Sequence, residues 1–253
     1  MEIKVGCCGF SIGRKTYYEI FNLVELQETF YNIPKIETVY KWRNEAPKDF
    51  EFIVKAWQAI THPSNSPTWR RMKTKIIENE KQYYGLLKPT KLNIEAWNKT
   101  LEICKILKSK VCLLQTPPQF NCTKENIQNI YEFLNKILRD YIFIAWEPRG
   151  NWKAPSNKEL IEKICKDLKL IHVVDILRHD PIITSEIAYT RLHGLGLKEY
   201  NYKYKYEDLE KLLIKIKELE KIGVSLVYVL FNNVWMKEDA ERFIKLLKKH
   251  KLI

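Results

Sequence analysis

Short apolar segments alternate with longer amphipathic segments along almost the whole chain, and this alternation limits the fold more than any other feature. The short segments have the length and the β-branched and aromatic content that favour β-strands. There are eight of them, at 3–8, 23–31, 50–59, 111–115, 141–147, 170–176, 188–193 and 225–231. Helical periodicity lies between most of them, at 17–22, 34–46, 94–108, 124–138, 157–168, 207–222 and 237–250. Strands joined by helices form parallel sheets, so the pattern predicts an α/β fold.

Eight strand–helix repeats favour a closed (β/α)8 TIM-type barrel, regular or irregular, as a single domain of residues 1–253. A doubly wound open sheet is the alternative. No G-x-G-x-x-G follows the first strand and no G-x-x-x-x-G-K-[ST] occurs, so the nucleotide-binding versions of that alternative lose support. Residues 63–90 do not fit the repeat. We expect them to form a helical insertion after the third strand, with one helix lying over the C-terminal face of the barrel.

The chain is basic, with a formal net charge of +12. Such a charge attracts polyanions such as nucleic acid, or phosphorylated metabolites. Lys-rich helix faces that are simply solvated are an equally good explanation of the charge.

Cysteine usage and hydropathy indicate a soluble cytoplasmic protein. The six cysteines form no C-x-x-C motif, and several lie in apolar runs, as expected of reduced core cysteines. The N-terminal residues lack the layout of a signal peptide. No apolar run approaches the roughly 18–20 residues that span a bilayer, so no membrane partner is expected.

Polar side chains occur at the ends of nearly all the predicted strands. Barrel active sites lie where the strands end, so we expect a functional cleft at this face. Residues i and i+2 of a strand share a face, so Glu147 should project with Arg149, and Arg191 with His193. The strand ends supply Glu25, Gln27, Lys55, Gln115, Glu147, Arg149, Asp175, Arg191, His193, Asn232 and Asn233, and His62 follows the third strand.

Three of these residues are candidate catalytic groups. Glu147 or Glu25 would act as a general base, and His193 would protonate a leaving oxygen. His193 could equally be a neutral core histidine. Pairing with a neighbouring arginine would lower the pKa of Glu147 and weaken it as a base.

The cationic residues are candidate contacts for a substrate anion. Arg149 and Arg191 can fork onto a phosphate or a carboxylate, and Lys55 can add a further contact. Alternatively, Lys55 forms a structural ion pair with Glu25 inside the barrel. Asp175 either contributes to the site or orients a neighbouring group.

Metal-binding signals are weak in this sequence. No H-x-x-x-H or H-E-x-x-H spacing occurs, and the strand ends offer too few ligands for a multi-zinc site. A single hard divalent cation on Glu25, Glu147 and Asp175 is the alternative to a metal-free site.

Tyrosine alternates with lysine in residues 198–206, after the seventh strand. Aromatic rings interleaved with cations suit stacked bases and a phosphate backbone, so Tyr202, Tyr204 and Trp152 are candidate stacking residues. In the alternative arrangement, the tyrosines pack on the barrel rim and the lysines face water.

Together these segments resemble the YecE-like family, also called domain of unknown function 72. The similar stretches run from the first strand to the last: 24–31 with Pro34, 52–62, 115–120, 147–149 with Trp152, 190–194 and 227–233. The resemblance implies a barrel related in shape to endonuclease IV and sugar-isomerase barrels. The chain differs from the usual pattern at Gly150, where histidine is common, and at Asn151, where serine is common.

By analogy of fold, the favoured function is binding and processing of a phosphate-containing substrate, and nucleic acid is the first candidate. We expect this function without a three-zinc site. This interpretation favours an enzyme, either a nuclease-like or phosphodiesterase-like hydrolase or a sugar-phosphate enzyme. A metabolic isomerase, lyase or hydrolase for a small sugar phosphate or carboxylate is the second hypothesis. A non-catalytic scaffold is the third.

Overall fold

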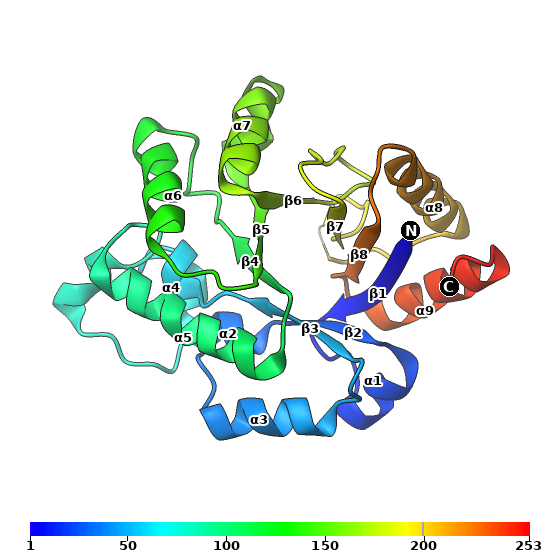
Figure 1. Ribbon diagram of the computed structural model, residues 1–253, viewed down its shortest axis with the longest axis horizontal. Helices are drawn as coiled ribbons and strands as arrows, with labels where there is room; N and C mark the ends of the chain where they lie inside the picture. The colour runs from blue at the N-terminus through cyan, green and yellow to red at the C-terminus, as the bar shows by residue number, and fades with distance from the viewer. Residues whose placement is uncertain (199) are drawn as a thin grey trace. The chain divides into compact units, whose positions relative to one another are not determined.

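The computed structural model describes residues 1–198 and 200–253, and within them eight strands form a closed barrel (Figure 1). Each strand neighbours the next one along the chain, and β8 pairs with β1. This order confirms the predicted α/β barrel. The strands are β1 (Glu2–Cys8), β2 (Leu23–Leu26), β3 (Glu51–Lys55), β4 (Val111–Gln115), β5 (Phe143–Glu147), β6 (Leu170–Val174), β7 (Ile187–Leu192) and β8 (Leu226–Phe231).

The helices begin and end close to the predicted positions. Thr90 and Thr123 cap two of them, because each hydroxyl accepts a hydrogen bond from a backbone N–H of the first turn. The helices are α1 (Arg14–Ile20), α2 (Glu28–Tyr31), α3 (Ile36–Glu45), α4 (Gln58–Thr61), α5 (Lys91–Leu107), α6 (Lys124–Lys136), α7 (Lys158–Leu168), α8 (Tyr206–Lys221) and α9 (Met236–Lys249).

Two of the predicted strands, 23–31 and 50–59, are longer than the strands that the structure contains there. β2 ends at Leu26 and the short helix α2 follows, and β3 ends at Lys55, with two residues between it and α4. All four residues of α4 are buried. A short apolar run cannot be assigned to a buried strand or a buried helix by periodicity alone, which explains both errors.

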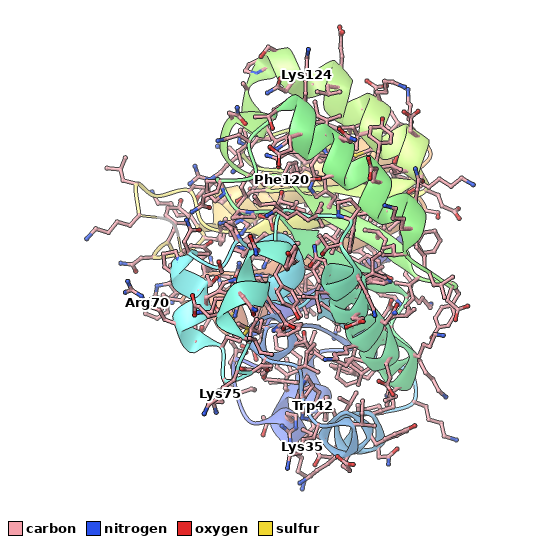
Figure 2. The ribbon with its side chains drawn as sticks, turned by 90° about the vertical axis from the view of Figure 1, so that its left-hand side faces the viewer. Lys35, Trp42, Arg70, Lys75, Phe120 and Lys124 are labelled. Carbon is pink, nitrogen blue, oxygen red and sulfur yellow. The ribbon has the colours of Figure 1, made fainter. Side chains whose placement is uncertain are left out.

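The insertion at 63–90 contains two 3-10 helices, η1 (Pro67–Arg71) and η2 (Glu78–Tyr83), in place of the single helix that was expected. Neither has a buried residue, so no apolar face stabilises a longer helix here. Gly85 returns the segment to α4: its backbone N–H donates to Ala59 O, and its φ is +78°. Figure 2 shows Arg70 and Lys75 on the outside of this segment. Its position over the C-terminal face stays a prediction.

The chain divides into two compact units, which we describe separately. Unit 1 comprises residues 1–25, 46–51 and 171–253, and unit 2 comprises residues 26–45 and 52–170. The expectation of a single domain stays a prediction. In unit 1, β8 pairs along most of its length with both β1 and β7. In unit 2, β4 lies between β3 and β5.

Within the described residues, no helix combines the length and the apolar character that crossing a membrane requires. All six cysteines are free thiols. Burial raises the pKa of Cys7 and of Cys165 to about 12, so both thiols stay protonated at neutral pH.

Candidate functional site

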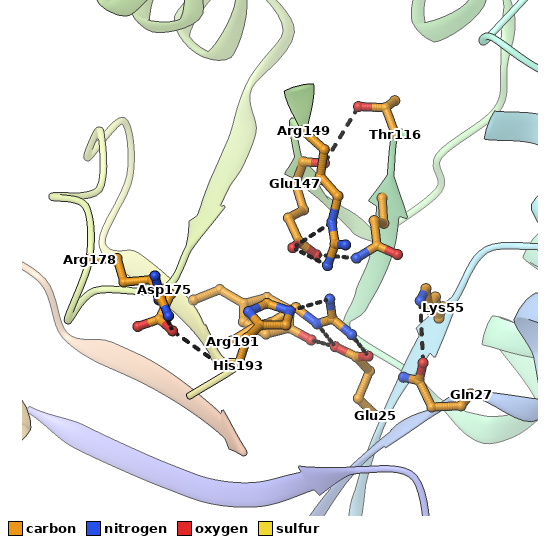
Figure 3. Close-up of polar contacts among 12 residues, drawn as sticks. Glu25, Gln27, Lys55, Thr116, Glu147, Arg149, Asp175, Arg178, Arg191 and His193 are labelled. Carbon is orange, nitrogen blue, oxygen red and sulfur yellow. Dashed lines mark hydrogen bonds and ion pairs between the residues drawn. The ribbon is translucent and has the colours of Figure 1, made fainter. Parts of the chain in front are cut away.

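In unit 1, a buried ion pair joins β2 to β7. The side chains of Glu25 and Arg191 are completely buried. Arg191 donates from Nε to Oε2 of Glu25 and from a terminal nitrogen to Oε1, both at 2.8 Å (Figure 3). The Tyr189 hydroxyl also donates to Glu25 Oε2. We call Glu25, Tyr189 and Arg191 the Glu25 cluster.

The Glu25 cluster uses the donor pair that the sequence analysis assigned to a substrate phosphate. Nε and one terminal nitrogen of Arg191 form the planar fork that would grip a phosphate, and here they hold a carboxylate. The role of Arg191 as a direct substrate contact therefore requires the ion pair to open. The geometry as it stands makes Arg191 a partner of Glu25.

His193 lies against Arg191, as the i, i+2 spacing predicted. The second terminal nitrogen of Arg191 is 3.4 Å from His193 Nε2. A guanidinium has only donors, so Nε2 is the acceptor in this contact, as a neutral imidazole allows. This matches the neutral-histidine alternative. To protonate a leaving oxygen, His193 would first have to gain a proton beside a cation.

Asp175 orients backbone groups around His193. It follows β6, and its Oδ2 accepts from the His193 backbone N–H at 3.1 Å. Its Oδ1 accepts from the backbone N–H of Leu177 at 3.1 Å. These contacts fit the orienting role that was one alternative for Asp175. Arg178, which the sequence analysis did not select, donates to the carbonyls of Gly194 and Gly196 and holds the loop after β7.

In unit 2, Glu147 and Arg149 form the second pair predicted from strand spacing. Arg149 donates to Glu147 Oε1 at 3.2 and 3.3 Å, and Gln115 donates to Oε2 at 2.8 Å (Figure 3). Gln115 and Glu147 are register partners at the ends of β4 and β5. The Arg149 side chain is 22% exposed and that of Glu147 is 6% exposed. This pair is therefore more accessible than the Glu25 cluster.

Lys55, at the end of β3, is also in unit 2. Its amine donates to Gln27 Oε1 at 3.3 Å and lies 4.2 Å from the centre of the Phe30 ring. Gln27 is not a strand residue, contrary to the prediction, because its backbone is already helical (φ −93°, ψ −23°) as the chain enters α2. This turn separates Gln27 from the strand pattern of Glu25.

His62 is a buried histidine whose pKa is lowered by its burial and by two cations. Burial, together with the positive charges of Lys55 and Arg149, lowers its pKa to about 3. Its Nδ1 lies 2.8 Å from the Thr61 hydroxyl, and its ring packs edge-on against Phe30. His62 is uncharged at neutral pH, so any direct contact with a substrate would be a neutral hydrogen bond.

The alternating segment 198–206 packs largely as the structural alternative proposed. Tyr204 is buried, and its hydroxyl accepts from the Gly194 backbone N–H at 2.7 Å. Tyr202 is partly buried and donates to Asp208 at 2.7 Å. Lys198, Lys203 and Lys205 are exposed. Glu199, in the same segment, lies outside the described residues.

Trp152 does not provide the stacking surface that was expected. It is completely buried, stacks on Phe120 and donates from its indole nitrogen to the Phe120 carbonyl at 2.5 Å. Beside it, Gly150 has φ +69°, and a Cβ there would lie 2.8 Å from Pro118 O. A histidine at position 150 would therefore need a different loop path. The Asn151 side chain helps to fix the present path by accepting from Cys122 N–H at 2.8 Å.

The two asparagines after β8 have different surroundings. Asn233 is buried and donates to Tyr202 O and to Asp239 Oδ2, so it ties the loop after β7 to α9. Asn232 is partly exposed, and its backbone N–H donates to Leu192 O. Of the two, Asn232 has the side chain that a substrate could reach.

Carboxylates and cations thus gather at strand ends in each unit. Within residues 1–198 and 200–253, no three His, Cys, Asp or Glu side chains are arranged to hold a metal ion. The single-cation alternative on Glu25, Glu147 and Asp175 gains no support from this arrangement. That the residues of both units line one pocket stays a prediction.

The chain is similar in sequence to the UPF0759 protein YunF of Bacillus subtilis (strain 168), with 28% identity over 246 residues, covering 87% of this chain and 79% of that protein. Its fold is similar to that of a DUF72 family protein from Enterococcus faecalis V583, with a TM-score of 0.75, 23% identity, and coverage of 100% and 98% of the two chains. A DUF72 family protein from Thermotoga maritima MSB8 gives a TM-score of 0.71 at 23% identity, covering 98% of this chain and all of that one.

More distant solved structures share only the fold. A D-tagatose 3-epimerase-like protein gives a TM-score of 0.56 at 16% identity, covering 99% of this chain and 97% of that one. A family 2 AP endonuclease from Brucella melitensis gives 0.52 at 8% identity, covering 98% of both chains. The family described as protein of unknown function DUF72 matches residues 13–252, nearly the whole chain. The chain therefore belongs to the DUF72 family, as the sequence motifs indicated.

Proposed function

We propose that this protein binds a phosphate-containing substrate at the carboxyl ends of β3, β4 and β5 and acts on it chemically, with nucleic acid as the favoured substrate. One observation carries the proposal. Besides burial, two cations, Lys55 at the end of β3 and Arg149 after β5, lower the pKa of His62, and the Glu147 carboxylate pairs with one of them, Arg149. A buried region with a positive field, at the end of a barrel where active sites lie, suits an anion.

Arg149 is the best candidate for the first contact with phosphate. Its side chain is 22% exposed, and it already binds a carboxylate, the group whose geometry most resembles a phosphate edge. Lys55 would add a point charge. Glu147, held by Gln115 and Arg149, would orient or deprotonate the attacking group once the substrate phosphate shares Arg149.

Nucleic acid is favoured by charge and by analogy of fold. The net charge is +12, and Arg70, Arg71, Lys73 and Lys75 are exposed in and after η1. Cations spread over a surface increase affinity for a nucleic-acid phosphate backbone, because binding releases the counterions of the phosphates. The fold likeness to a family 2 AP endonuclease supports the same substrate class by analogy only.

A small sugar phosphate is the second candidate. Trp152 and Tyr204, two of the three expected stacking residues, are buried and offer little surface to a base. The likeness in fold to a D-tagatose 3-epimerase-like protein supports a sugar-like substrate by the same kind of analogy.

A binding assay separates these substrates. Labelled single-stranded, duplex and abasic DNA and RNA are titrated at several salt concentrations, with simple sugar phosphates as competitors. We expect salt-dependent binding that Arg149→Ala weakens about tenfold, the effect of losing one charge-assisted contact. Lys99→Ala, which removes an exposed charge on α5, is the control and should change binding little.

Turnover tests the chemical part of the proposal. Glu147→Gln should retain binding and lower the rate on whichever probe is processed. If no phosphate-containing probe binds at low salt, or if Arg149→Ala binds as the wild type does, the proposal is wrong. We also propose a cytoplasmic location, which the free thiols support.

A further inference from the structure

Exposed apolar side chains occur on two loops of unit 1 that a backbone hydrogen bond joins. Trp235 is 39% exposed and Val234 is 69% exposed in the loop after β8, and Leu197 is fully exposed in the loop after β7. Strands β7 and β8 are paired, so both loops leave the barrel on the same side. The Val234 backbone N–H donates to Tyr200 O at 2.8 Å and joins the loops directly. Clustered exposed apolar groups of this kind mark interaction surfaces.

Hydrogen bonds anchor Gly194 and Tyr202 of one loop and Asn233 of the other. Arg178 binds the carbonyl of Gly194, and the Tyr204 hydroxyl accepts from the Gly194 backbone N–H. On the other loop, Asn233 donates to Tyr202 O. Val234 and Trp235 therefore follow directly on an anchored residue, which lowers the entropic cost of binding through them.

Lysines and acidic residues both surround these side chains, and a lysine lies against the indole ring. The Lys203 amine lies 4.6 Å from the centre of the Trp235 ring, and Lys198 and Lys205 are exposed nearby in sequence. Glu207 and Glu238 are exposed in the first turns of α8 and α9, whereas the other two acids of those turns are already hydrogen-bonded. Asp208 accepts from Tyr202 and from the Lys205 backbone N–H, and Asp239 accepts from Asn233 and Arg242.

We propose that Lys203, Val234 and Trp235 form a platform for an unpaired base of single-stranded nucleic acid. The base stacks on the face of the Trp235 indole that Lys203 does not cover, and Lys203 contacts the adjoining phosphate. An exposed indole next to lysines matches the alternation of flat bases and phosphates in a single strand. The inference rests on the proposed phosphate-binding function and narrows its substrate class.

The test compares two probes of equal length, an oligothymidylate and an abasic deoxyribose-phosphate oligomer, at one low salt concentration. Trp235→Ala should weaken binding of the oligothymidylate about tenfold, the usual effect of losing one stacked base, and leave the abasic oligomer unchanged. Trp235→Phe keeps a ring and should restore most of the affinity. Lys203→Ala should weaken both probes. Tyr141→Ala is the control, because Tyr141 is a 53% exposed aromatic residue that precedes β5.

The result that overturns the platform is equal behaviour of wild type and Trp235→Ala on the oligothymidylate, or equal losses on both probes. Arg149→Ala distinguishes this failure from that of the proposed function. If Arg149→Ala weakens the abasic oligomer while Trp235→Ala affects neither probe, the phosphate site stands and the platform is wrong. If the abasic oligomer and every phosphate-containing probe fail to bind, both proposals are wrong.

Discussion

Replacing Glu25 with glutamine should destabilise the protein strongly, because it leaves the Arg191 charge buried without its counter-charge. Glu25 and Arg191 have no exposed side-chain surface, and two donors of Arg191 meet the two carboxylate oxygens at 2.8 Å. In Glu25→Gln, one of these donors would face an amide NH2 group. Removing one partner of a buried ion pair costs about 3–5 kcal/mol. For a chain of 253 residues, that loss lowers the melting temperature by about 6–20 °C.

Urea unfolding of four proteins measures this effect: wild type, Glu25→Gln, Arg191→Met and the double variant Glu25→Leu/Arg191→Met. The double variant removes both charges, so it should be more stable than either single variant. Glu132→Gln on α6 is the control, since Glu132 is an exposed member of a surface pair and its replacement should leave the urea midpoint almost unchanged. A loss below about 1 kcal/mol for Glu25→Gln, or a double variant that loses the sum of the single losses, would refute the reasoning.

Three further predictions concern local features of the fold. The pKa of His62 is lowered to about 3 from a usual 6.5, so between these pH values the unfolded chain binds a proton that the folded chain does not. The free energy of unfolding should therefore fall as pH drops below 6.5, by up to about 1.4 kcal/mol per pH unit. His62→Gln should reduce this pH dependence, measured by urea titrations at pH 5 and pH 7. An unchanged pH dependence would contradict the burial argument. Thr123→Ala removes the cap of α6 and should cost about 1 kcal/mol in the same assay, whereas the exposed Thr74→Ala should cost almost nothing. Gly150→Ala should lower the free energy of unfolding by about 1–3 kcal/mol, because the φ of +69° and the nearby Pro118 carbonyl oppose a side chain. Gly13→Ala is the matched control, since a Cβ at Gly13 would have no heavy atom within 4 Å. Equal effects of the two substitutions would show that the loop at Gly150 adapts freely.

The barrel and two of its side-chain pairs were predictable because both depend on local periodicity. Strand alternation fixed the fold class, and the i, i+2 rule paired Glu147 with Arg149 and Arg191 with His193. The same rule also predicts the position of Tyr189, which the sequence analysis did not select. Tyr189 is two residues before Arg191 and therefore shares its face of the strand, and its hydroxyl donates to Glu25.

What the sequence did not reveal depends on tertiary contacts. Trp152 follows a strand end, where rings are often exposed, yet the loop containing Phe120 covers it completely. Gln27 left the strand pattern because the chain turns into α2 one residue after β2. Arg178 has no motif at all, since its partners are backbone carbonyls in a loop 16 to 18 positions away.

The difference in solvation between the two carboxylate–arginine pairs suggests separate roles for them. Glu25 and Arg191 have already lost all contact with water, so an incoming phosphate would have to replace Glu25 inside a closed cluster. Arg149 keeps 22% of its side chain exposed, and a phosphate can join it without breaking a fully buried pair. Substitutions at Glu25 should therefore appear mainly as lost stability, and substitutions at Arg149 mainly as lost affinity with little change in the urea midpoint. Affinity and the urea midpoint are measured independently. If Arg149→Ala lowered the urea midpoint as much as Glu25→Gln does, the Glu147–Arg149 pair would be structural as well.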